Sequence, residues 1–150
     1  MTAPGTGAGE GGTDARRVAL HTLDRLVGTW AVQSAGSSGT VRYSWFEGDA
    51  FLVQEVDLVA DGDVTRGVEY IGWDPESESL RSHYFGSSGE ILEYTYDLSG
   101  ATLTIWFGGP DSPAKFVGDF DAADQQNTGA WEWPGGGYAS TMTRIEEAAS

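Results

Sequence analysis

Short runs of alternating apolar and polar residues dominate the chain from Gly28 onwards. A period of two predicts β-strands that bury one face, and these runs are rich in Val, Ile, Thr and aromatic residues. Turn segments of two to six residues, rich in Gly, Asp, Ser and Pro, separate them. Turns of this length join antiparallel neighbours. The pattern therefore predicts an antiparallel meander of about ten strands, over 28–34, 40–47, 50–59, 64–73, 79–86, 90–98, 101–107, 114–121, 126–133 and 138–146.

The two faces of the predicted strands differ in character. In 90–98, one face carries Leu92, Tyr94, Tyr96 and Leu98, and the acidic residues lie mostly on the other. A long meander in a small domain leaves edge strands, and closing the sheet removes them. We therefore expect an all-β fold, a single antiparallel up-and-down β-barrel with one solvated face.

The segment before the first strand has a different period. Apolar residues recur at three- and four-residue spacing within 14–27, which predicts a short amphipathic helix closing one end of the barrel: Val18, Ala19, Leu23, Leu26 and Val27. Residues 1–13 are rich in Gly without periodicity and predict a flexible leader. We expect one barrel domain over 14–147 and a tail over 148–150.

The charge balance narrows the range of partners. The chain has 23 acidic and 8 basic residues and a formal net charge of −15. Nucleic-acid and anionic-membrane partners need clustered Lys and Arg, so we expect neither. The absence of cysteine excludes a disulfide framework, a thiolate metal site and a cysteine nucleophile, and no metal-ligand spacing is present. We expect a cytoplasmic protein, monomeric or homodimeric, with no bound metal.

Aromatic residues are the most informative candidates for a function. A barrel of about ten strands is wider than the kind whose side chains just fill it, so it favours a cavity unless large residues occupy the interior. Aromatic walls with polar tips suit a flat apolar ligand, although core packing is the better explanation for any one ring taken alone. The predicted ligand-binding residues are Tyr43, Trp45, Tyr84, Tyr94, Tyr96, Trp106, Phe116, Trp131, Trp133 and Arg144.

Three residues are candidates for acid–base chemistry. His83 lies inside a predicted strand, but the alternate set of Leu80, Ser82 and Tyr84 is the better interior face. A carboxylate inside an apolar barrel has a raised pKa and can transfer protons, which makes Glu55 and Glu69 candidates. The face opposite Glu55 is the more apolar one in its strand.

The start and end of the predicted barrel carry a resemblance. A short helix followed by Gly28-Thr29-Trp30, with Arg144 in the last strand, resembles the calycin superfamily of lipocalins and fatty-acid-binding proteins. The resemblance implies that Gly28 turns the chain from the helix, Trp30 plugs the barrel floor, and Arg144 seals it.

Further segments resemble a narrower group. Trp45–Gln54, Ile71–Asp74, His83–Gly89, Phe116–Phe120 and Gly129–Glu132 are similar to an uncharacterised, largely actinobacterial family of lipocalin-like barrels. More distantly, the chain resembles nitrobindin-like haem barrels, which hold haem through a His on a late strand, but the last predicted strand has none. The ending Thr143–Glu146 resembles the Thr-Arg-x-Tyr of fatty-acid-binding proteins, with Glu146 in place of Tyr.

These observations favour one function and leave two others open. We expect the barrel to bind a small apolar or aromatic molecule, without a cofactor. The alternative is a cofactor-independent isomerase or cyclase that acts on such a molecule through His83, Glu55 or Glu69. The third interpretation is a haem-binding barrel, which the missing late-strand His argues against.

Overall fold

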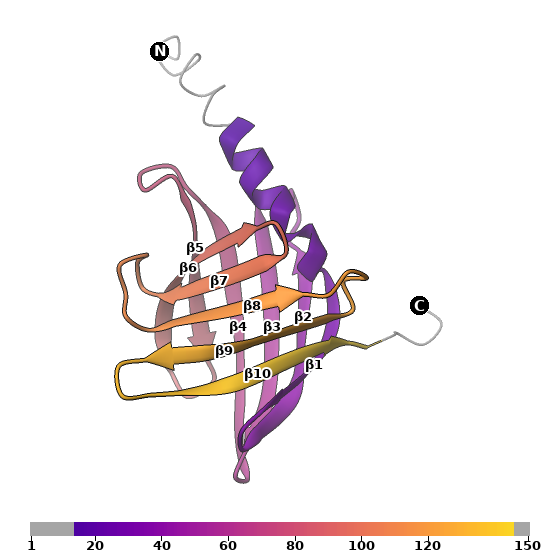
Figure 1. Cartoon of the computed structure of the whole chain (residues 1–150). Coiled ribbons are helices and arrows are strands. Elements are labelled where there is room, and N and C mark those ends of the chain that lie inside the picture. Colours follow the sequence, from indigo (N-terminus) through magenta and orange to yellow (C-terminus); the bar gives the residue numbers. More distant parts are fainter. Residues whose placement is uncertain (1–13, 146–150) are drawn as a thin grey trace.

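The computed structural model describes residues 14–145, which form a closed barrel of ten antiparallel strands (Figure 1). The strands are β1 (Gly28–Ser34), β2 (Ser37–Trp45), β3 (Phe51–Ala60), β4 (Asp63–Asp74), β5 (Ser79–Gly86), β6 (Ile91–Ser99), β7 (Thr102–Phe107), β8 (Lys115–Phe120), β9 (Gln126–Trp133) and β10 (Gly136–Arg144). Every strand pairs with its neighbours in sequence, and β1 pairs with β10 to close the sheet. The predicted all-β barrel is confirmed. The predicted leader and tail lie outside the described residues.

Strand boundaries differ from the prediction mainly where glycine and serine are concentrated. β2 begins at Ser37 rather than at residue 40, and β10 at Gly136 rather than at residue 138. These residues indicated turns, but Gly39 lies inside β2, opposite Val32 and Leu58. A Cβ on Gly39 would lie 2.1 Å from the carbonyl oxygen of Asp57, so glycine is needed here for close backbone approach.

The C-terminal part of the predicted helix packs on one end of the barrel, where β1 begins (Figure 1). Residues 14–22 are α-helical, and the last turn, η1 (Leu23–Leu26), tightens to a 3-10 helix. Leu20, Leu23 and Leu26 are buried against the barrel core. Within residues 14–145, no helix has the length and apolar character needed to cross a membrane.

Trp30 forms the floor of the barrel at this end. Its side chain is fully buried, and its indole Nε1 donates to the carbonyl oxygen of Leu26 at 2.8 Å. The guanidinium of Arg144 lies 4.2 Å from the ring centroid, which is cation–π geometry. Gly28 has a φ of +130°, and a Cβ there would lie 2.5 Å from Arg144 Nη1. Trp30, Gly28 and Arg144 thus meet at the closed end.

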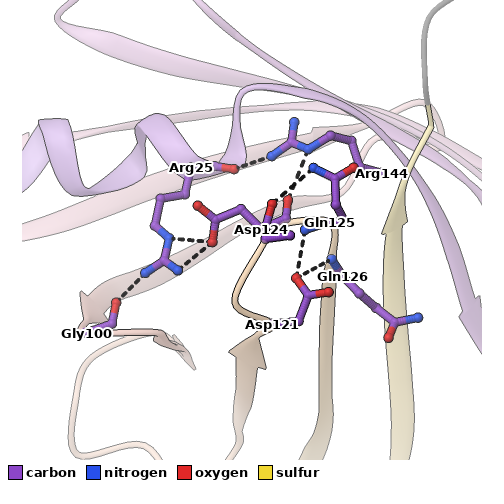
Figure 2. A network of polar contacts seen from close by, with 8 residues as sticks. Arg25, Gly100, Asp121, Asp124, Gln125, Gln126 and Arg144 are labelled. Atoms are coloured by element: carbon purple, nitrogen blue, oxygen red, sulfur yellow. Dashed lines mark hydrogen bonds and ion pairs between the residues drawn. The ribbon is translucent and has the colours of Figure 1, made fainter.

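Two arginines join the helix to the strand ends (Figure 2). Arg144 donates to the carbonyl oxygens of Val27 at 2.6 Å, Arg25 at 2.8 Å and Asp124 at 3.1 Å. Arg25 in turn donates from Nη2 and Nε to the carboxylate of Asp124, at 2.6 and 3.2 Å. The guanidinium of Arg144 is therefore committed to the floor, and its donors are directed at backbone rather than into the interior.

We expect Arg144→Met to destabilise the barrel by about 2 kcal/mol, because it removes charge-assisted hydrogen bonds and the contact with Trp30. Arg42→Met is the matched control, since Arg42 is exposed on β2 and should change stability by less than about 0.5 kcal/mol. Urea unfolding followed by tryptophan fluorescence measures both. Equal stability of the two variants would show that Arg144 does not hold the closed end together.

Candidate ligand cavity

A cavity of about 570 Å³ occupies the barrel interior above the floor. It extends to the β1–β2 turn and to Glu90 beside the β5–β6 turn, at the barrel end away from the helix. Ala35 and Glu90 are exposed there, so the cavity opens to solvent at this end. Its volume lies within the ~300–1,000 Å³ typical of small-molecule sites.

Aromatic and aliphatic side chains make most of the cavity wall. The alternation in β6 directs Leu92, Tyr94 and Tyr96 inward, as the sequence predicts. The ring centroid of Trp131 lies 5.7 Å from that of Phe116 and 6.1 Å from that of Tyr94. The predicted ligand-binding residues that line the cavity are Tyr43, Tyr84, Tyr94, Tyr96, Phe116 and Trp131, and Tyr138 joins them.

Four predicted ligand-binding residues lie outside the cavity wall. Arg144 is in the floor, and Trp45 lies at the closed end, where its Nε1 donates to Asp24 Oδ1 at 3.0 Å. Trp106 is on the outer face, since Leu103 and Ile105 take the inward positions of β7. Trp133 shares the phase of Trp131 but lies at the end of β9, 42% exposed and packed on Tyr138.

Two of the three candidate acid–base residues face solvent. His83 lies on the outer face of β5. Its side chain is half-exposed, and its Nε2 lies 3.8 Å from Oε2 of Glu93. Its neighbours Ser82 and Tyr84 point inward, as the sequence favours. Glu55 is exposed on β3, where Gln54 and Val56 face the cavity instead. Neither residue can reach a molecule in the interior.

Glu69 is the carboxylate that faces the interior. It lies near the middle of β4, between Gln54 on β3 and Tyr84 on β5. Its side chain is buried and lines the cavity. The Ser82 hydroxyl donates to Oε2 at 2.5 Å, and the Tyr96 hydroxyl lies 3.0 Å from both carboxylate oxygens.

Burial sets the protonation of this group. Loss of hydration raises the pKa of Glu69 to about 7, although the hydrogen bonds from Ser82 and Tyr96 oppose the rise. Burial also raises the pKa of Tyr96 and Tyr43 well above the usual tyrosine value, and that of Tyr94 to about 12. Glu69 therefore changes charge near neutral pH while the surrounding tyrosines remain neutral.

Two buried polar atoms on the cavity wall have no hydrogen-bond partner within the described residues. They are the hydroxyl of Tyr84, whose ring packs on Gly67, and Nδ2 of Asn127. Asn127 is only 1% exposed and was not a sequence candidate. The alternation of β9 is the signal that could have identified it, because Asn127 and Trp131 are four residues apart and share the inward face of this strand. Buried polar atoms are normally paired, so both suit a polar group of a ligand.

The cavity does not suit haem held by histidine. The two histidines of the chain are His21, exposed in the helix, and His83, exposed on β5. Neither lines the cavity, so a haem iron there would have no histidine ligand. Among residues 14–145, no three His, Asp or Glu side chains lie close enough together to hold a metal ion.

No family model matches the chain, and no curated protein matches it at a significant level.

Proposed function

We propose that the barrel is calycin-like and binds a small apolar or aromatic molecule in its interior. The observation that carries the proposal is the cavity of about 570 Å³, open at one end and walled by aromatic rings. The floor supports the calycin-like assignment, because Trp30 plugs the end and Arg144 covers it, as the resemblance implies.

A filled core would have served stability better than this arrangement. Interiors are close-packed, and an empty space of this size gives up dispersion contacts that larger side chains would make. The wall also carries polar atoms without partners, which cost free energy until a ligand pairs with them. Binding of a molecule that fills the space and pairs these atoms accounts for both features.

Native mass spectrometry of the purified protein, beside the same sample denatured, tests the proposal. We expect extra mass in the native spectrum that disappears on denaturation. For protein stripped of retained molecules, we expect fluorescence enhancement and saturable 1:1 binding of the neutral probe N-phenyl-1-naphthylamine. A bare protein mass together with no probe binding would contradict the proposal, because an open apolar cavity of this size accommodates the probe.

Glu69 favours a second candidate, a cofactor-independent isomerase or cyclase. A buried carboxyl group with a pKa of about 7 is matched to proton transfer near neutral pH, and Ser82 and Tyr96 hold it in place. The same spectrometry distinguishes the two functions when the sample is incubated in D₂O. An enzyme would exchange a C–H hydrogen of the retained molecule for deuterium, and Glu69→Gln would stop the exchange, whereas a binding protein leaves the molecule unlabelled.

A further inference from the structure

The charged groups of the cavity are all acidic. Besides tyrosines, the ionisable side chains that line it are Glu69, deep in the interior, and Glu90, at the open end. Within residues 14–145 no Lys, Arg or His lines the cavity, and Arg144 directs its donors to backbone carbonyl oxygens at the floor. A carboxylate or phosphate ligand would enter a site with no counter-charge, in a protein of net charge −15.

Glu69 can accept further hydrogen bonds. An ionised carboxylate accepts about four hydrogen bonds, and here the two hydroxyls of Ser82 and Tyr96 supply the bonds that the protein makes. Glu69 lines the cavity, so its remaining acceptor positions are available to a ligand. The rings of Tyr84, Tyr94 and Tyr96 line the same interior, and aromatic faces attract cations.

The opposite wall offers a donor. Asn127 lies on β9, and Glu69 lies on β4, five steps away in either direction around the closed strand order. Asn127 Nδ2 is buried and unpartnered, and it takes only an acceptor. The interior thus has a hydrogen-bond acceptor, Glu69, on one wall and a hydrogen-bond donor, Asn127, on the other. Apolar and aromatic surface separates the two.

We propose that the natural ligand is a hydrophobic amine, with a protonated nitrogen at Glu69, an aromatic or aliphatic body against the tyrosines, and a hydrogen-bond acceptor toward Asn127. This inference rests on the proposed function and specifies the ligand class. An ammonium group at Glu69 offsets the loss of hydration of the carboxylate, because opposite charges attract strongly where water is excluded.

Binding of such a ligand is coupled to the release of a proton. A cation favours the ionised form of Glu69, whose pKa is about 7 without ligand, so binding at pH 7 releases a proton from a large share of the molecules. The groups that face Glu69 are Tyr43 on β2, Tyr84 on β5, and Tyr94 and Tyr96 on β6, and burial raises the pKa of each. They stay neutral at this pH, so the proton comes from Glu69.

Three naphthalene compounds of nearly equal size test the ligand class: 1-naphthylmethylamine, 1-naphthalenemethanol and 1-naphthoate. By titration calorimetry at pH 8 we expect the amine to bind at least about tenfold more tightly than the alcohol, and the acid to bind weakest. At pH 7, titrations of the amine in two buffers of different ionisation enthalpy should show proton release, and those of the alcohol should not.

Two variants test whether Glu69 causes the preference for the amine over the alcohol. In Glu69→Gln, which keeps the size of the side chain, the amine and the alcohol should bind within about twofold of each other, and proton release should vanish. Glu55→Gln is the matched control on the outer face and should keep the wild-type preference. The comparison of the three compounds on wild-type protein stands even where a variant folds poorly.

The outcomes separate this inference from the proposed function. Binding of N-phenyl-1-naphthylamine with no preference for the amine over the alcohol overturns the inference and leaves the proposed function intact. A preference for the amine that persists in Glu69→Gln also overturns it, because the charge would then be recognised elsewhere. Failure of all four compounds to bind wild-type protein overturns the proposed function itself.

Discussion

Substitution of Glu69 by Gln should abolish a large loss of stability that the wild-type barrel undergoes as the pH rises. The folded-state pKa of Glu69 is about 7, above the 4.5 of a glutamate side chain in water. A raised folded pKa means that the protonated carboxyl stabilises the fold. This contribution is fully present below about pH 4.5 and is lost as the pH rises through about 7. Its size follows from the shift and is about 3 kcal/mol.

Urea unfolding between pH 5 and pH 8.5 measures this effect. The difference in unfolding free energy between wild type and Glu69→Gln should change by about 2.5 kcal/mol across the range, with wild type relatively weaker at the alkaline end. General repulsion among the many carboxylates acts on both proteins alike and cancels in the difference. Glu55→Gln should run parallel to wild type. Parallel curves for wild type and Glu69→Gln would show that Glu69 is ionised without cost, and hence hydrated, in the folded protein.

The fold was largely predictable because its signals are local. Alternation in segments such as 90–98 gives the strands, and short turns give the antiparallel order. Prediction failed at Gly39, where a turn-forming residue lies inside β2, because the need for glycine arises from the backbone of a neighbouring strand. No property of the segment itself reveals that contact.

The sequence predicted which side chains of the candidate site point inward, but it did not predict how far along the barrel each of them lies. Alternation separates Ser82 and Tyr84 from His83, and it gives the inward position of Trp131. It does not say how far along the barrel a residue lies, so Trp133, with the same phase as Trp131, was also expected in the cavity although it lies at the end of β9.

The protonation of Glu69 has a different origin. Its inward direction follows from alternation in β4, but its environment comes from Ser82 on β5 and Tyr96 on β6, which are 13 and 27 residues away in the sequence. The raised pKa depends on closure of the barrel, which removes water from around the carboxyl group. A strand pattern therefore gives the inward direction of Glu69 but not its raised pKa.

Filling the cavity should abolish binding of the neutral probe without unfolding the barrel. Leu92 lines the interior of β6 opposite Tyr84, so Leu92→Trp places an indole in space that a ligand would occupy. We expect the affinity for N-phenyl-1-naphthylamine to fall by about 100-fold, which is about 3 kcal/mol. Ile91→Trp is the matched control, because Ile91 is the adjacent residue, 64% exposed on the outer face, and its variant should bind within about twofold of wild type.

This pair of variants decides where the probe binds. Both add the same indole to the same strand, so a general effect of hydrophobic bulk or of added fluorescence appears in both. Unfolding measurements should find Leu92→Trp within about 2 kcal/mol of wild type, because the indole enters open space rather than a filled core. If instead Ile91→Trp weakens binding and Leu92→Trp does not, the probe occupies the outer apolar surface. The aromatic interior would then be a loosely packed core, and the proposal of an internal ligand would fail.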